Sequence, residues 1–85
     1  MNNVIEIYFA APSYGVLRTK GHAYSYMINQ NQDKYLNIGD VICLINNENK
    51  ISIATVSAKR YEADPQTKYK PLVLTNAYNL NIYPR

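Results

Sequence analysis

Residues 35–57, YLNIGDVICLINNENKISIATVS, decide the fold of this 85-residue chain. Val41 to Ile45 is a continuous apolar run, which is typical of a buried strand. Asn46 to Asn49 predicts a hairpin loop, because Asn tolerates positive φ and bonds its own backbone. Lys50 to Ser57 returns as the partner strand. The middle of the chain is therefore predicted to be a β-hairpin.

A period of two continues on both sides of this hairpin. Alternating or extended stretches predict further strands at Val4 to Ala10, Val16 to Thr19, His22 to Ile28 and Leu72 to Thr75. Residues 29–34 are polar and predict a loop, and residues 58–61 are expected to curve away from the sheet. The tail has Leu80, Ile82 and Tyr83 to dock against the rest. Short strands at close spacing indicate one all-β domain spanning residues 1–85, as a small barrel or a strongly bent sheet.

Composition excludes several classes of protein. Hydrophobic residues make up 47% and charged residues 18%, which is too apolar for a disordered tail. A single Cys rules out an internal disulfide, and no apolar run approaches the roughly 18 residues of a membrane-spanning helix. The start of the chain lacks a signal-peptide pattern, so we expect a cytoplasmic protein without membrane contact. The net charge of +3 permits contact with phosphates without demanding it.

The middle hairpin carries a family resemblance. Leu36-x-Ile38-Gly39-Asp40-Val41, followed by Ile53-Ala54-Thr55-Val56, resembles the hydrophobic-x-x-Gly-Asp-x-Val hairpin of SH3-like barrels. With Tyr24-x-Tyr26 before it and Lys70-Pro71-Leu72 after it, the pattern is similar to the N-terminal DNA-binding domain of primosomal replication-restart helicases and to small phage-encoded proteins. The resemblance covers about residues 22–73. It implies a small SH3-like barrel of about five strands that binds DNA.

The sequence does not support an enzyme. His22 and Cys43 are the only residues of their types, which is too few for a zinc site. Cys43 lies in an apolar strand, where a thiol is normally inert and part of the core. No glycine-rich phosphate loop or dinucleotide fingerprint is present. We therefore expect no catalytic residues, no metal and no cofactor.

Interleaved basic and aromatic residues are the best functional candidates. Basic side chains neutralise phosphates, while tyrosine rings stack on unpaired bases. The predicted nucleic-acid-binding residues are Arg18, Lys20, Tyr24, Tyr26, Lys59, Arg60, Tyr61, Lys68, Tyr69 and Lys70. For this function, Lys59, Arg60, Lys68 and Lys70 are expected to form one exposed patch that includes at least one exposed tyrosine. Their common role would be that of a non-enzymatic binding module.

Plainer interpretations of the same residues stay open. Tyr24 and Tyr26 share a face with Ile28, so that face is equally interpretable as the core. The lysines and arginine are also typical of solvated loops. A second function class is protein interaction or homo-oligomeric assembly, through Val4, Tyr8 or a tail strand added to a neighbour. The resemblance to phage-encoded proteins implies a third possibility, a protein that binds or blocks a host component.

Overall fold

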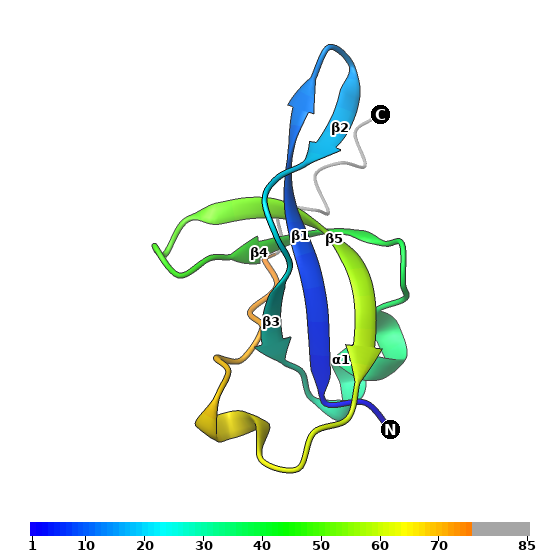
Figure 1. Cartoon of the computed structure of the whole chain (residues 1–85), viewed down its shortest axis with the longest axis vertical. Coiled ribbons are helices and arrows are strands. Elements are labelled where there is room, and N and C mark those ends of the chain that lie inside the picture. Colours follow the sequence, from blue (N-terminus) through cyan, green and yellow to red (C-terminus); the bar gives the residue numbers. More distant parts are fainter. Residues whose placement is uncertain (76–85) are drawn as a thin grey trace.

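Two ten-residue strands, β1 (Val4–Ser13) and β5 (Ile51–Arg60), are the centre of one antiparallel sheet in a computed structural model that describes residues 1–75 (Figure 1). Five strands and one short helix make up a mostly β architecture, as the alternating pattern predicts. The remaining elements are β2 (Val16–Thr19), β3 (Tyr24–Met27), α1 (Gln30–Tyr35), β4 (Val41–Ile45) and the 3-10 helix η1 (Pro65–Thr67). The strand order is β2-β1-β5-β4, and β3 pairs with β1.

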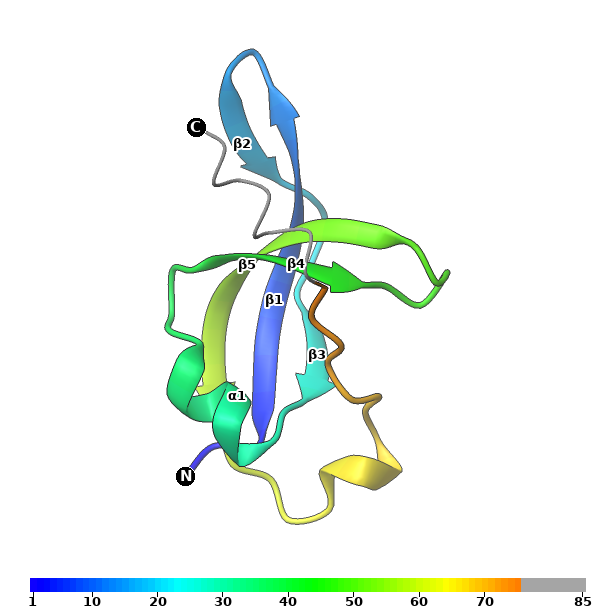
Figure 2. The same ribbon diagram turned by 180° about the vertical axis from the view of Figure 1, so that it is seen from behind.

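The expected closed barrel is not formed. Within residues 1–75, β3 and β4 do not pair with each other, and residues 70–75 run between them (Figure 2). This segment makes one parallel bridge, Met27↔Pro71, and one antiparallel bridge, Leu44↔Leu74. Pro71 has no N–H to donate, and the segment crosses from one strand to the other within a few residues. The strand predicted over Leu72 to Thr75 is therefore reduced to isolated bridges.

The predicted loop over residues 29–34 is wrong, because most of it is helix α1. Asn29 caps the helix: its side chain accepts from the Gln32 N–H at 2.8 Å, and the Gln32 side chain accepts from the Asn29 N–H at 3.0 Å. This reciprocal pair is a capping box, which satisfies two otherwise unpaired donors. Gln32 also donates to the Leu72 carbonyl at 3.0 Å, so the helix is tied to the segment between β3 and β4.

The prediction that residues 58–61 curve away from the sheet is wrong, because strand β5 stays in the sheet as far as Arg60. Ala58, Lys59 and Arg60 pair with Glu6, Ile5 and Val4, and an irregularity in the register lies between Glu6 and Ile7. Extra residues at such a bulge increase the local twist without ending the strand. Lys59 and Arg60 are neighbours in one strand, so their side chains point to opposite faces of the sheet.

The core lies on one face of the sheet. Ile5 and Ile7 of β1 are fully buried in it, and Phe9 packs against it. Val4, on the opposite face of β1, is also fully buried, so its expected role as an exposed contact for protein interaction is wrong. Tyr26 is also a core residue at 4% exposure, whereas Tyr24 is 41% exposed. The cluster of buried residues is Ile5, Ile7, Tyr26, Ile28, Leu36, Ile42, Leu44, Ala54, Val56 and Leu72. The predicted docking of Leu80, Ile82 and Tyr83 lies outside the described residues.

The far end of β1 and strand β2 form a two-stranded arm that projects beyond the rest of the sheet (Figure 1). All four residues of β2 are exposed. Tyr14 and Gly15 make the two-residue turn with φ of +52° and +81°, as a type I′ hairpin requires. Pro12 lies past Ala10↔Ile53, the last pair between β1 and β5, so its missing N–H costs no bond there. Among residues 1–75, no helix is long and apolar enough to cross a bilayer.

Candidate functional site

A groove of about 610 Å³ lies where the arm leaves the sheet. One side is formed by the second half of β1 and the start of β3, and the other by the β4–β5 hairpin. The residues that line it are Phe9, Ala10, Ala11, Pro12, Lys20, Gly21, Tyr24, Tyr26, Asn46, Asn47, Glu48, Ile51, Ser52 and Ile53. Its volume is in the range of small-molecule and cofactor sites.

Three aromatic rings form a row at this groove. The rings of His22 and Tyr24 are stacked, with centroids 4.8 Å apart and an interplanar angle of 28°. Tyr24 meets Phe9 edge to face at 5.2 Å. The sheet register explains this placement: Tyr24 pairs with Ile7, which is on the same face of β1 as Phe9. Edge-to-face and offset pairs of this kind hold rings in fixed orientations.

Tyr26 brings a buried polar atom to the groove. Its hydroxyl has no hydrogen-bond partner among residues 1–75. Burial, with a smaller contribution from Tyr24, raises the pKa of the Tyr26 hydroxyl above its ordinary value. The group is therefore a neutral O–H at physiological pH. An unpaired buried hydroxyl destabilises the folded state.

The cations Arg18 and Lys20 lie beside this aromatic row. Lys20 lines the groove, and its backbone N–H donates to the Phe9 carbonyl at 2.8 Å. Arg18 pairs with Ala11, which lines the groove, and Arg18 lies two residues before Lys20 on the same side of its strand. Both cations are exposed, and neither has an ion pair in the part of the chain that the structure describes. Residues 7–32 contain no Asp or Glu at all.

The opposite wall is a hairpin held by its own side chains. The Asn46 side-chain oxygen accepts from the backbone N–H groups of Glu48 and Lys50, at 2.8 and 3.1 Å. The Asn46 amide nitrogen donates to the Ser52 hydroxyl at 2.6 Å. These contacts fix the loop that the Asn-rich sequence predicted. Glu48 contributes the acidic side chain of the groove lining.

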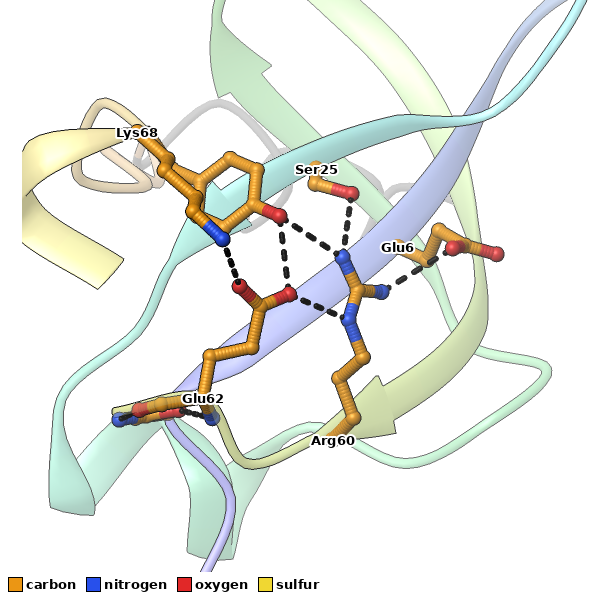
Figure 3. Close-up of polar contacts among 7 residues, drawn as sticks. Glu6, Ser25, Arg60, Glu62 and Lys68 are labelled. Atoms are coloured by element: carbon orange, nitrogen blue, oxygen red, sulfur yellow. Dashed lines mark hydrogen bonds and ion pairs between the residues drawn. The ribbon is translucent and has the colours of Figure 1, made fainter. Parts of the chain in front are cut away.

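The second candidate surface, at the end of β5, is a paired cluster around Arg60 (Figure 3). The Arg60 guanidinium donates to Glu62 at 2.7 Å, to Glu6 at 3.0 Å and to the Ser25 hydroxyl at 3.2 Å. It also donates to the Tyr69 hydroxyl at 3.2 Å and lies 5.8 Å from the centre of that ring. The Tyr69 hydroxyl in turn donates to Glu62 at 2.8 Å. Each of the three guanidinium nitrogens therefore donates at least one hydrogen bond.

Charge is balanced within this Arg60 cluster. Lys68 lies 3.5 Å from Glu62, so two cations face the two carboxylates of Glu6 and Glu62. The hydrogen bond from Arg60 and then that from Tyr69 lower the pKa of Glu62, and the same contact with Glu62 raises the pKa of Arg60. Both shifts favour the charged pair. The cluster thus has little attraction left for an external phosphate.

Lys59 is engaged on the opposite face of β5. Its ammonium pairs with Asp33 at 3.1 Å and donates to the carbonyls of Asp33 and Leu36, both at 2.8 Å. These carbonyls lie at the C-terminal end of α1, where a cation is favoured by the helix dipole. The hydrogen bond from Lys59, followed by that from the Asn2 N–H, lowers the pKa of Asp33. Lys59 therefore fastens α1 to β5.

The ten predicted site residues thus fall into separate groups. The groove and its rim bring together Arg18, Lys20, Tyr24 and Tyr26, and the Arg60 cluster brings together Arg60, Lys68 and Tyr69. Lys59 is on the other face of β5, while Tyr61 and Lys70 are exposed. The four basic residues Lys59, Arg60, Lys68 and Lys70 do not form one unpaired patch.

Sequence reasoning left three contributors out of its site. Phe9 was included only in the strand predicted over Val4 to Ala10, and His22 only as the first residue of the strand predicted over His22 to Ile28. Asn47 was interpreted as part of a turn. Only the pairing of β1 with β3 and the approach of the β4–β5 hairpin bring Phe9 and Asn47 to one groove, where His22 stacks on Tyr24. The alternation of Phe9 with Ile5 and Ile7 was the one available signal, since it placed Phe9 on the inner face of β1.

No three His, Cys, Asp or Glu side chains of residues 1–75 come together as metal ligands would. Comparisons of the chain with family models, with curated proteins and with solved structures give no match. The groove is therefore interpreted from its own chemistry.

Proposed function

We propose that this chain is a non-enzymatic binding module for single-stranded nucleic acid, and that the groove at the base of the arm is its binding site. One observation carries the proposal: the row of rings formed by His22, Tyr24 and Phe9 reaches the groove, next to Arg18 and Lys20, which have no ion pair within residues 1–75. Proteins that bind single strands combine aromatic platforms for bases with a positive surface for the backbone.

In this proposal, Tyr24 contacts a base, and Lys20 and Arg18 contact phosphates. Tyr24 is 41% exposed and already fixed by two ring neighbours, so its ring is available to a base at little entropic cost. Each base that stacks on an aromatic side chain contributes about 1–3 kcal/mol. Lys20 and Arg18 neutralise phosphates of the same strand, and each released counterion makes binding weaker at higher salt.

The Arg60 cluster is not the site in this proposal. Its cations already have carboxylate partners, and displacing those partners would leave Glu6 and Glu62 facing a phosphate. Like charges at such distances repel. We also propose that the sheet is an opened relative of SH3-like barrels, in which residues 70–75 occupy the place of a closing strand. The isolated bridges to β3 and β4 support this comparison.

Fluorescence anisotropy of a labelled single-stranded oligonucleotide, at about 50 and 200 mM salt, tests the function. Wild-type protein is expected to bind with micromolar or better affinity that falls with salt. Lys20→Gln should weaken binding several-fold and lower the salt slope by about one. Tyr24→Ser should weaken binding by at least about fivefold with the slope unchanged.

Matched controls lie away from the groove. Lys34→Gln, on the exposed side of α1, removes the same charge, and Tyr61→Ser removes a ring that is even more exposed than that of Tyr24, at 69% against 41%. Both should bind like wild type. The proposal is overturned if no binding occurs at the lower salt, or if the control variants lose as much affinity as the groove variants.

Protein interaction is a second candidate, favoured by the exposed apolar residues of the arm. Val16 and Leu17 are 52% and 39% exposed, on a strand with one unpaired edge among the described elements. Such an edge accepts a strand from another chain. Light scattering over a range of concentrations tests this candidate, since a constant monomer mass contradicts self-association through the arm.

A further inference from the structure

Tyr14 at the tip of the arm violates the local rules of its own turn. Its side chain is fully exposed, and its backbone has a φ of +52°. Positive φ is a genuine outlier for a bulky residue, and a type I′ turn strongly prefers Asn, Asp or Gly at this position. Among residues 1–75, no packing contact of this fully exposed ring offsets the cost. A structural role therefore does not explain the tyrosine.

Strained backbone conformations cluster at functional sites. Tyr14 also lies at the most projecting point of the arm, which Figure 1 shows extending away from the body of the sheet. Two independent observations, the backbone conformation and the full exposure of a large ring, thus point to an external partner.

Charge indicates what that partner is. The arm carries Arg18 and Lys20, and no carboxylate occurs anywhere in residues 7–32. Arg18 pairs with Ala11, which is a residue of the groove lining. The six residue steps from Lys20 to Tyr14 span at most about 20 Å at the rise of a strand. A positive surface therefore continues from the groove toward the tip and ends at an exposed ring.

We propose that the arm is a second contact surface for the same single strand, and that the ring of Tyr14 stacks on a base beyond the groove. This inference rests on the proposed function. The arm adds reach: a short oligonucleotide fills the groove alone, and a longer one also meets Arg18 and Tyr14. Affinity is therefore expected to rise with the length of the oligonucleotide by more than the larger number of binding positions on a longer strand would give.

Two labelled oligothymidylates, of about 4 and about 12 nucleotides, separate the groove from the arm, since they bracket the usual site sizes of small single-strand-binding domains. Tyr14→Asn is the main variant, because Asn-Gly is a favoured type I′ turn and the arm should fold at least as well without the ring. We expect Tyr14→Asn to weaken binding of the longer probe about five- to tenfold and to leave the shorter probe unchanged.

Tyr14→Phe keeps the ring and should restore wild-type affinity for the longer probe. A thermal midpoint of Tyr14→Asn at or above that of wild type shows that the loss is not unfolding. If both probes bind and Tyr14→Asn binds the longer one normally, the inference is overturned while the groove function stands. If neither probe binds the wild type, the proposed function fails first.

Two other partners would also use an exposed ring beside cations. Co-sedimentation with vesicles that contain anionic lipid tests a membrane surface, and light scattering tests a second copy of the chain. Vesicle binding or dimerisation that Tyr14→Asn abolishes, with oligonucleotide binding unaffected, would overturn the inference in favour of that partner. Absence of both, with the length-dependent loss, supports it.

Discussion

At the end of the sheet next to α1, the cations Lys59 and Arg60 are held by carboxylates, whereas at the end that carries the arm, Arg18 and Lys20 have no such partner within residues 1–75. Both ends place basic residues beside tyrosines. The two ends differ in the number of nearby carboxylates. Glu6, Asp33 and Glu62 lie at one end, whereas Glu48 is the one acidic residue that lines the groove at the other. A basic-aromatic pattern thus stabilises the fold where carboxylates meet it and leaves a binding surface where they do not.

The largest expected effect contrasts the apolar residues of the two ends. Leu36 follows α1 and is 1% exposed, so Leu36→Ala should lower the free energy of unfolding by about 2–4 kcal/mol. Ile51 lines the groove and is 58% exposed, so Ile51→Ala should change it by less than about 0.5 kcal/mol. Urea unfolding of the two variants measures the difference. Equal losses would mean that the groove side is part of the core.

Arg60→Met should have the next largest effect on stability. It leaves Glu6 and Glu62 without their shared cation, but the cluster is about one-third exposed and water screens the remaining charges. We expect a loss of about 1–2 kcal/mol in the free energy of unfolding. Oligonucleotide affinity should stay within about twofold of wild type. Arg18→Met is the matched variant, with the opposite expectation: unchanged stability and weaker binding.

The carboxylates at the α1 end of the sheet should also make the stability of the fold depend on pH, with a smaller effect than the substitution of Arg60. The pKa of Glu62 lies below its ordinary value of 4.5 in the folded protein, and that of Asp33 lies below 3.8. Above these ordinary values both states are ionised, and the stabilisation is complete. As pH falls, the unfolded chain binds protons first, so stability is lost until the folded carboxylates are also protonated.

Thermal unfolding between about pH 6 and pH 3 measures this loss. The midpoint should be nearly constant down to about pH 5 and then fall. Glu62→Gln removes one of the two groups and should flatten the fall, while Glu48→Gln, at the groove, should leave it as in wild type. A midpoint that rises toward acid would contradict the ion pairs at this end.

Much of the sheet follows from the sequence, because alternation is a local signal. Strands β1, β4 and β5 and the Asn-rich hairpin were all expected from the period of two and from turn chemistry. The helix was missed because its residues form no apolar stripe, although Asn29 and Gln32 are spaced as a capping box. The open sheet was missed because Pro71 and the crossing between β3 and β4 weaken pairing that a pattern of apolar residues alone suggests.

The candidate site was predictable only in its residue types. Tyr24 and Lys20 were named from the interleaving of basic and aromatic residues, and the structure places both at the groove. Lys59 and Arg60 were named by the same reasoning but are paired, since Asp33, Glu6 and Glu62 reach them only through the folded topology. Long-range pairing of charges leaves no local signal in a single sequence. Tyr14 was missed because its conformation is visible only in the folded turn.

The smallest expected effect concerns the buried hydroxyl of Tyr26, at the groove end of the sheet. In the Arg60 cluster, Tyr69 donates to Glu62 and removing its hydroxyl would cost a charge-assisted bond. Tyr26 has no partner among residues 1–75, so Tyr26→Phe removes an unpaired polar atom and keeps the ring. We expect unfolding to become harder by zero to about 1 kcal/mol, measured by urea unfolding. Destabilisation by Tyr26→Phe comparable to that by Tyr69→Phe would show that the hydroxyl is bonded in solution, and that both ends use their tyrosines in the same way.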